Sequence, residues 1–258
     1  MSAAPKVSFQ NVHIAFGENK VLECFNLNVD SGESVTVIGG SGTGKSVMLK
    51  CLLGLLQPQR GSITVDGNEL LGIGSAQRER VLAKFGMLFQ NAALFDSLPV
   101  WENVAFRLIQ GEGCPRAKAR KIALEKLVQV GLRADVADVR PAELSGGMRK
   151  RVALARAIAT EPEILLFDEP TTGLDPIMGN VIDRLIVRCV KELGATAISI
   201  THDMASARRI SDRIAMLYQG QVIWAGAASD IDAADNAVVG QFIQGHADGP
   251  IQFDMPVS

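Results

Sequence analysis

The eight residues GGSGTGKS, at positions 39–46, match the phosphate-binding pattern G-x-x-x-x-G-K-[ST] in full. They follow the short apolar run SVTVIG, at 34–39, which predicts a buried strand, and they open the apolar helical pattern KSVMLKCLLGLL, at 45–56. A strand, a glycine-rich turn and a helix in this order point backbone N–H groups and the positive end of the helix at phosphate groups. The stretch therefore predicts an α/β fold with a nucleoside triphosphate site.

Two side chains of this loop have defined chemical tasks. We expect Lys45 to contact the β- and γ-phosphates and the hydroxyl of Ser46 to ligate Mg²⁺. The other loop residues that we expect around the nucleotide are Gly39, Gly40, Ser41, Gly42, Thr43, Gly44 and Val47.

A second apolar run, ILLFDEP at 164–170, ends in two carboxylates. Parallel α/β sheets bind ligands at the carboxyl ends of their strands, so Asp168 is expected to hold Mg²⁺ and Glu169 to orient the attacking water as general base. The alternative is an exposed acidic pair with no function, which a complete phosphate loop in the same chain disfavours. Asp175 precedes Pro176 and is also explained as a helix N-cap.

Gln90 and His202 each end a short apolar run, FGMLFQ at 85–90 and ISITH at 198–202. A lone glutamine or histidine usually needs no functional explanation. Both residues, however, are expected at the same edge of the sheet as Asp168, where they would meet the γ-phosphate, its metal or the attacking water.

The composition narrows the class of protein. With 47% hydrophobic and 5% aromatic residues, the 258-residue chain can bury the large aliphatic core of a layered α/β fold. A net charge of −2 offers no overall field for nucleic acid, and the basic stretch PRAKARK, at 115–121, is typical of a solvated helix face. The four cysteines are scattered, which predicts reduced thiols, and the sequence predicts neither a secretion signal nor a membrane span.

The chain has two patterns of apolar residues, one alternating and one continuous. Alternating apolar residues at 6–30 predict antiparallel strands, and the pairs Asp66-Gly67 and Gln219-Gly220 predict the turns of two hairpins. Continuous apolar runs separated by helices predict a parallel core sheet. We expect one domain over 1–258, with a core at about 1–96 and 159–244, an inserted helical subdomain at about 97–158 and a tail at 245–258.

A second helix start with the chemistry of an anion site stands at ELSGGM, residues 143–148. The chain carries, in this order, the phosphate loop, Gln90, LSGGM, LLFDE, GLDP and His202. In the order and spacing of these motifs it resembles the nucleotide-binding subunit of ABC transporters over essentially its whole length. LSGG is the most specific of these motifs. The resemblance implies a P-loop NTPase of the ABC ATPase type, with a mixed core sheet, an antiparallel β-subdomain and an inserted helical subdomain.

The resemblance also implies a partner for the second helix start. In this family two cassettes pair head to tail, so Ser145, Gly146 and Gly147 are expected to bind the γ-phosphate of ATP held by the other copy. It further implies that Gln90 ligates Mg²⁺, that His202 acts in hydrolysis and that Asp175 lies at the nucleotide. Adenine commonly stacks on a tyrosine in the first hairpin, where this chain offers Phe16, and the alternative is that Phe16 belongs to the core.

Several longer stretches are similar to the ATPases of Mce-type phospholipid transporters, the Mla system of Gram-negative bacteria. They are LFQNAALFDSLPVWENVAFRL at 88–108, LSGGMRKRVALARAIA at 144–159, DEPTTGLDP at 168–176, THDM at 201–204 and ADGPIQF at 247–253. This resemblance implies a homodimer at the cytoplasmic face of the inner membrane, bound to a transmembrane permease, an Mce-domain protein and often a small STAS-domain protein. Such a system moves phospholipid between the inner and outer membranes and maintains outer-membrane lipid asymmetry.

The segment NAALFDSLPVWENV, at 91–104, lies where this family contacts a helix of the permease. Its apolar residues are explained equally well as a groove for that helix and as part of the helical subdomain's own core. These residues are Leu94, Phe95, Leu98, Val100 and Trp101.

Three other readings compete with phospholipid transport. An ABC importer or exporter ATPase for another substrate has the same motifs. A soluble ABC ATPase acting on nucleic acid or ribosomes carries two cassettes or a long coiled coil, and this chain has one phosphate loop. A switch that binds ATP without turnover is disfavoured because Lys45, Asp168, Glu169 and His202 are all present.

The tail, DGPIQFDMPVS at 248–258, alternates apolar residues with polar or proline residues. The period of two predicts an extended segment with one apolar side at Ile251, Phe253, Met255 and Val257. We expect this segment to lie on the partner ATPase, whereas a frayed chain end is the alternative.

Overall fold

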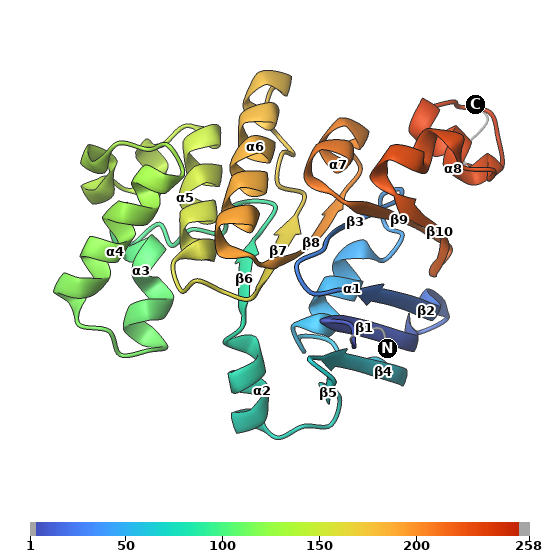
Figure 1. The fold of residues 1–258 in the computed structure, drawn as a ribbon, viewed down its shortest axis with the longest axis horizontal. Helices are drawn as coiled ribbons and strands as arrows, with labels where there is room; N and C mark the ends of the chain where they lie inside the picture. The colour runs from blue at the N-terminus through green and yellow to red at the C-terminus, as the bar shows by residue number, and fades with distance from the viewer. Residues whose placement is uncertain (1–3, 253–258) are drawn as a thin grey trace.

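The continuous apolar runs form the centre of a six-stranded sheet with the order β10-β9-β3-β8-β7-β6 (Figure 1). In the computed structural model, which describes residues 4–252, β3 and β6 to β9 run parallel, and β10 pairs antiparallel with β9. Central strands of such a sheet are covered on both faces, which is why their sequence is continuously apolar. The strands are β3 (Ser34–Ile38), β6 (Phe85–Leu88), β7 (Ile164–Asp168), β8 (Thr196–Thr201), β9 (Arg213–Tyr218) and β10 (Gln221–Ala227).

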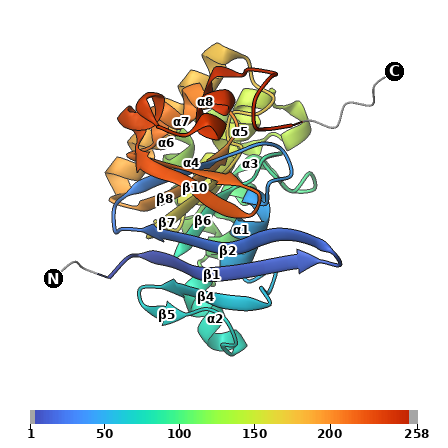
Figure 2. The same ribbon diagram turned by 90° about the vertical axis from the view of Figure 1, so that its right-hand side faces the viewer.

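The alternating segments form a second, antiparallel sheet with the order β2-β1-β4-β5. Its strands are β1 (Val7–Phe16), β2 (Asn19–Val29), β4 (Arg60–Val65) and β5 (Asn68–Glu69). Figure 2 shows this sheet below the six-stranded one, with α2 (Ser75–Leu82) at the far end.

Both predicted hairpins are confirmed. Asp66 and Gly67 turn between β4 and β5 with φ values of 51° and 73°, and Gln219 and Gly220 turn between β9 and β10 with φ values of 47° and 77°. Positive φ at both central positions is the turn geometry that follows the right-handed twist of the flanking strands.

Helices cover both faces of the six-stranded sheet. The helix α1 (Lys45–Leu52) lies between the two sheets, and its buried side chains join one apolar cluster with residues of both (Figure 1). The opposite face carries α6 (Pro176–Leu193) and α7 (Met204–Ile210), and α8 (Ala237–Gln244) lies beyond them near β10. The loop before α1 is thereby fixed at the carboxyl end of a central strand.

The segment between β6 and β7 is helical and packs at the β6 edge of the sheet (Figure 1). It consists of α3 (Val100–Gln110), α4 (Arg116–Gln129) and α5 (Gly146–Ile158), with 3₁₀ turns at Ala134–Asp138 and Pro141–Glu143. A further 3₁₀ segment, Ala228–Ala233, follows β10. The basic stretch at 115–121 lies on α4, where Arg116 and Arg120 stack over the ring of Trp101. The predicted fold class is confirmed, whereas the exact subdomain boundaries stay a prediction.

Gln241 in α8 fixes the chain where it leaves the last helix. Its side-chain amide donates to the carbonyls of His246 and Ile251 and accepts from the N–H of Ile251 at 2.7 Å. Ile251 itself packs against the apolar cluster of β9, α7 and α8. The other three apolar residues of the predicted tail pattern, Phe253, Met255 and Val257, lie outside the described residues.

Candidate functional site

The phosphate loop follows β3 and leads into α1, as the motif requires. Its glycines have conformations that side chains cannot share. At Gly39, with φ 153°, an added Cβ would lie 2.4 Å from the carbonyl oxygen of Leu217, and at Gly44, with φ 104°, it would lie 2.9 Å from that of Val21. The loop is therefore held tightly against β2 and β9, with the start of α1 directly behind it.

Lys45 lies folded over this loop. Its Nζ donates to the carbonyls of Gly39 and Gly40, at 2.7 Å each, and its side chain is buried. The pKa of Lys45 is lowered overall, because burial outweighs the charges of Glu169 and Asp168, which raise it. The ammonium is thus kept within the loop and near both carboxylates, where phosphate oxygens can replace the carbonyls as acceptors.

Asp168, the last residue of β7, carries a buried oxygen without a partner. Among the described residues, nothing donates a hydrogen bond to its Oδ1. The pKa of Asp168 is raised overall, because burial and the charge of Glu169 outweigh the charges of Lys50, Lys150 and Lys45. A buried, unsatisfied carboxylate oxygen beside a phosphate loop fits Mg²⁺, which prefers oxygen ligands.

Glu169 is the most tightly held carboxylate of the site. Its Oε1 lies 3.0 Å from Nδ1 of His202, and its Oε2 accepts from the hydroxyls of Thr172 at 3.0 Å and Thr201 at 3.3 Å. Its backbone has φ 47°, and its N–H donates to the carbonyl of Ile200 at 2.9 Å. These contacts fix both the side chain and the backbone in one orientation.

The sheet brings the predicted polar residues to one edge. Gln90 follows β6, Asp168 ends β7 and His202 follows β8; these are neighbouring parallel strands, and the phosphate loop follows β3 beside β8. The carboxyl ends of all four strands therefore open onto one site. Phe16, at the end of β1, has half of its surface exposed and is free of the core clusters, so its ring can stack on a base.

Three residues of this site were missed by sequence reasoning. Thr172 and Thr201 bind the Glu169 carboxylate, and Lys150 donates from α5 to the carbonyls of Gln90 and Glu169. Thr201 could have been found, because it directly precedes His202 at the end of the same strand. Lys150 gave no signal, because the approach of α5 to the sheet is a tertiary contact.

The second helix start lies apart from the phosphate loop of the same chain. Ser145 caps α5, with its Oγ accepting from the N–H of Met148 at 3.3 Å, and α5 packs against β6. The phosphate loop follows β3, and β8 and β7 separate β3 from β6. The start of α5 packs against the start of α6, where an added Cβ at Gly147 would lie 2.6 Å from the end of the Met178 side chain. Asp175 caps α6 in a similar way, accepting from Ile177 and Met178, as the N-cap reading predicts.

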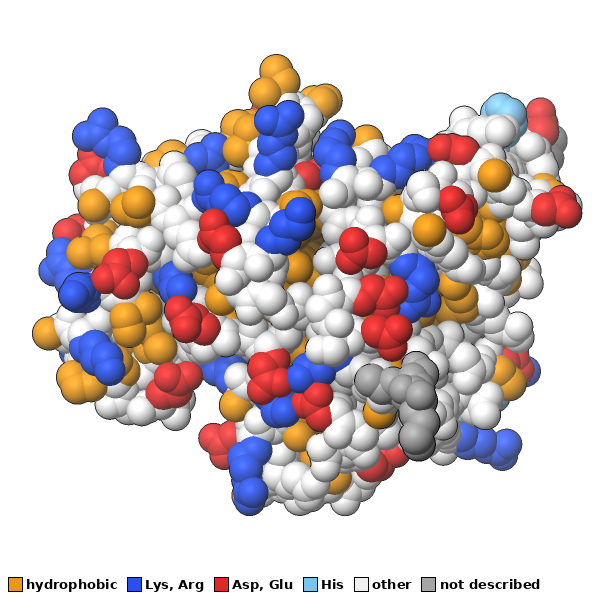
Figure 3. Space-filling model, viewed as in Figure 1, with side chains coloured by type: hydrophobic (Ala, Val, Ile, Leu, Met, Phe, Trp, Pro, Cys, Tyr) orange, Lys and Arg blue, Asp and Glu red, His pale blue; other side chains and the backbone are white. Residues whose placement is uncertain are grey.

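A second candidate site is a groove of about 760 Å³ between α2 and the helical segment. The hollow between these two parts is visible in Figure 3. Its apolar lining includes Leu55, Ile73, Leu82, Phe85, Met87, Phe89 and Phe106. Arg107 of α3 spans its base, donating to the carbonyls of Phe85 at 2.6 Å and Leu82 at 3.2 Å. The groove is therefore a fixed apolar surface with a polar base.

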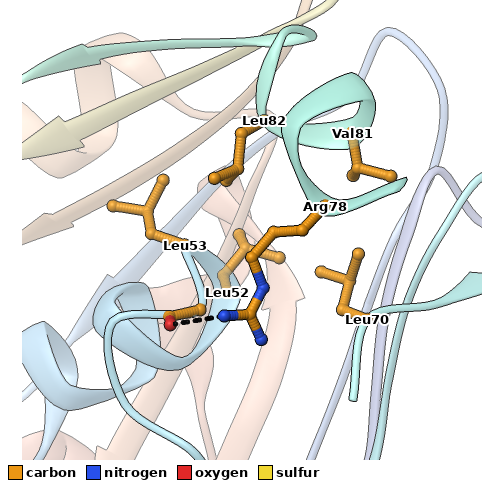
Figure 4. A pocket seen from close by; sticks show the side chains of 7 residues that line it. Leu52, Leu53, Leu70, Arg78, Val81 and Leu82 are labelled. Carbon is orange, nitrogen blue, oxygen red and sulfur yellow. Dashed lines mark hydrogen bonds between the residues drawn. The ribbon is translucent and has the colours of Figure 1, made fainter. Parts of the chain in front are cut away.

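The wall formed by α2 is tied to the phosphate-binding helix. Figure 4 shows Arg78 reaching from α2 among Leu52, Leu53 and Leu70, and its guanidinium donates to the carbonyl of Gly54 at 3.4 Å. Gly54 follows the C-terminal end of α1, where a positive charge is favourable. A partner in the groove thus contacts residues that touch α1.

The structure separates the two explanations for the apolar residues at 94–101. Val100 and Trp101 are buried in the core of the helical segment, and Leu94 packs against it. Phe95 is 42% exposed and stacks on Phe106, whose ring lies at the groove, with 4.4 Å between ring centroids. Core packing is therefore correct for Leu94, Val100 and Trp101, and none of the five apolar residues predicted at 94–101 is among those that line the groove.

No helix within residues 4–252 is long and apolar enough to cross a membrane.

Comparison with known proteins identifies relatives of the whole architecture. The family described as ABC transporter matches residues 22–172. The chain is 37% identical to the intermembrane phospholipid transport system ATP-binding protein MlaF of Haemophilus influenzae, over 97% of this chain and 94% of that protein. It is 39% identical to the probable ribonucleotide transport ATP-binding protein mkl of Mycobacterium tuberculosis, over 92% of this chain but only 66% of the mycobacterial protein.

Solved structures agree with this assignment. The dimeric post-hydrolysis state of an ATP-binding cassette bound to ADP and Pi superimposes with a TM-score of 0.78 and 35% identity. The match covers 86% of this chain and 98% of that one.

Proposed function

The chain belongs to the ABC transporter family, and from this premise we propose that it is the ATP-hydrolysing subunit of a transporter that moves phospholipid between the inner and outer membranes. One observation carries the enzymatic part of the proposal. The Glu169 carboxylate is held by His202 beside the unpartnered oxygen of Asp168, at the sheet edge that bears the phosphate loop. An ATP-binding switch without turnover would not need this arrangement.

The residues of the site divide the chemistry among them. Lys45 and the amides of residues 39–46 bind the phosphates, and Phe16 stacks on adenine. Ser46, Gln90 and Asp168 would hold Mg²⁺, which neutralises phosphate charge when bound. Glu169 orients the attacking water and accepts its proton, and His202 fixes the Glu169 carboxylate in place.

The second helix start serves a second copy of the chain. Ser145, Gly146 and Gly147 form the start of α5, where backbone N–H groups and the positive end of the helix suit an anion, and Ser145 and Gly146 are exposed. In a head-to-tail homodimer they bind the γ-phosphate of ATP held by the partner. Asp175, which caps α6, lies nearby. ATP then joins the two copies, and loss of the γ-phosphate on hydrolysis releases them.

The groove at α2 and α3 takes the membrane partner. Its apolar lining and its size suit one short amphipathic helix from a transmembrane permease. The proposal therefore includes a peripheral position for the chain, at the cytoplasmic face of the inner membrane. An Mce-domain protein and a small STAS-domain protein complete the proposed assembly.

Phospholipid is favoured over other substrates by the extent of the match. The chain covers 94% of the Haemophilus protein, whose name states intermembrane phospholipid transport. It covers 66% of the mycobacterial protein, whose name states ribonucleotide transport.

Purification from a native membrane with its partners tests the proposal. The assembly should hydrolyse ATP, and mass spectrometry of the copurified molecules should find phospholipid together with a transmembrane permease. ATP-driven transfer of labelled phospholipid between two sets of vesicles is the direct readout. Hydrolysis with a bound ribonucleotide and no lipid transfer would refute the substrate while leaving the ATPase assignment intact.

A further inference from the structure

Lys150 is a buried lysine that the roles assigned above leave unused. It lies in α5, one helical turn after Gly146, and is only 5% exposed. Its Nζ donates to the backbone carbonyl of Gln90 and, at 3.2 Å, to that of Glu169. One ammonium group thus joins α5 to the segments that follow β6 and β7.

The backbone that Lys150 binds at Glu169 is strained. A left-handed conformation such as φ 47° is unfavourable for an L-residue, so it persists only where the surroundings hold it. The N–H of Glu169 is held by the carbonyl of Ile200, and its carbonyl is held by Lys150. These two hydrogen bonds set the direction in which the Glu169 side chain leaves the chain toward His202.

The segment after β6 is bound by α5 in the same manner. Lys150 takes the carbonyl of Gln90, and two turns further on Arg156 donates to the carbonyls of Ala92 and Ala93, at 2.6 Å each. Ala92 and Ala93 also have positive φ values, of 60° and 49°. The buried Lys150 and the half-buried Arg156 of one helix therefore hold two unusual backbone segments at the edge of the site.

The charge of Lys150 lies in the field of the two site carboxylates. Burial lowers the pKa of Lys150, whereas the charges of Asp168 and Glu169 raise it. A buried ammonium is costly unless it is paired and hydrogen-bonded. Two backbone carbonyls and the nearby carboxylates offset part of this cost, but burial outweighs them and the pKa of Lys150 is lowered overall.

We propose that Lys150 is a positioning residue for ATP hydrolysis, which holds the backbone of Glu169 and of Gln90 in the orientation needed for attack on the γ-phosphate. The inference rests on the proposed ATPase function. Because Ser145 caps α5, Lys150 also links the helix start assigned to the partner's nucleotide with the general base of the chain's own site. A shift of α5 changes both hydrogen bonds and so changes the placement of Glu169.

Two substitutions whose side chains are similar in length distinguish the effect of losing the hydrogen bonds from the effect of altered packing. Lys150→Met keeps an unbranched side chain and removes the donors, whereas Lys150→Gln keeps an N–H₂ group that donates to two acceptors. Misplacement of a catalytic group by about 1 Å costs up to about 100-fold in rate, so we expect Lys150→Met to lower kcat by about 10- to 100-fold with KM for ATP within about twofold. Lys150→Gln should stay within about fivefold of the wild-type kcat.

A matched control uses another buried lysine of the helical segment. Lys126 of α4 pairs with Glu161 at 3.0 Å, and neither residue is among those assigned to the ATP site. Lys126→Met should lower thermal stability while leaving kcat unchanged. Equal losses of kcat in Lys126→Met and Lys150→Met would overturn the proposal, because they would indicate a general effect on the helical segment.

A double-mutant cycle tests whether Lys150 acts through Glu169. In a Glu169→Gln background, Lys150→Met should lower the residual single-turnover rate by less than about twofold, since the group that it positions is already lost. Multiplicative losses would overturn the proposal.

If Lys150→Met does not fold, Lys150→Gln decides alone: a folded variant with more than about a fivefold loss of kcat contradicts the role. A wild-type chain without ATPase activity would instead refute the proposed function.

Discussion

Nδ1 of His202 lies 3.0 Å from Oε1 of Glu169, although the two residues follow different strands and are 33 positions apart. The distance depends on the register of β7 and β8, in which Asp168 is paired with Ile200. In this register Glu169, the residue after β7, comes level with Thr201, the last residue of β8, and its side chain reaches both Thr201 and the following His202. The parallel sheet thus builds the pair of side chains on which the hydrolytic reaction depends.

Replacing Glu169 by glutamine tests its role as general base. The amide keeps the size of the side chain but accepts protons poorly, so turnover should fall by about 10²- to 10⁴-fold. Nucleotide binding should persist, because Lys45 and the phosphate loop are unchanged. ATPase rates and ATP affinity, measured on the same preparation, check this; a variant with near-normal turnover would refute the assignment.

Replacing His202 by alanine tests the orientation of Glu169. The carboxylate keeps its hydrogen bonds to Thr172 and Thr201 but loses the contact to Nδ1. We expect kcat to fall by about 10- to 100-fold, with ATP affinity within about threefold. His246→Ala, at an exposed position in the C-terminal segment, is the matched control and should have wild-type kinetics. Equal kinetics of the two variants would show that His202 is dispensable.

The sequence predicted the site better than it predicted the surfaces around it. Lys45, Asp168 and Glu169 lie in short motifs, in which a strand and a turn determine where each residue stands. Gln90 and His202 could be assigned to one edge because parallel strands share the direction of their carboxyl ends. Lys150 and Thr172 could not be found in this way, since their roles depend on how α5 and the loop after β7 approach the sheet.

Val100 and Trp101 illustrate the same limit on the apolar side. In the sequence they are indistinguishable from Phe95, because all three are large apolar residues near the start of one helix. Packing of α3 on α4 and α5 buries Val100 and Trp101 and leaves Phe95 exposed. Which residues face a partner is therefore decided by tertiary packing.

The groove predicts which exposed leucine matters for assembly. Leu55 lines the groove and is 67% exposed, while Val128 is 60% exposed on α4 and does not line it. Leu55→Glu should abolish copurification of the membrane partner, because a carboxylate cannot be buried against an apolar helix without a large cost. ATP binding by the isolated chain should be unchanged, and Val128→Glu should assemble normally. Normal assembly of Leu55→Glu would place the membrane partner elsewhere.

The cysteines predict a graded reaction with thiol reagents. Burial raises the pKa of Cys51 and Cys189 to about 11, so almost none of either thiol is ionised near pH 7.5, and both are inaccessible. Cys24 is exposed and Cys114 is half-buried. We expect Cys24 to react first and Cys51 and Cys189 more than about 100-fold more slowly, at the rate of local opening. Mass spectrometry of the labelled protein measures this order, and the unfolded chain, in which all four should react, is the control.

Mixed dimers test whether one copy completes the ATP site of the other. Ser145→Arg places a bulky cation at the helix start that faces the partner, and Lys45→Ala removes the phosphate contact, so each variant alone should be inactive. In a heterodimer of the two, the Ser145→Arg copy contributes an intact phosphate loop and the Lys45→Ala copy an intact Ser145-Gly146-Gly147 start. One site is then complete, and activity should return to at most half of the wild-type rate.

The ATPase rate is measured on the heterodimer after separate tags on the two copies have been used to isolate it. If isolated heterodimers stay inactive, while a heterodimer of wild-type and Lys45→Ala copies is active at one site, sites completed by the partner copy are ruled out.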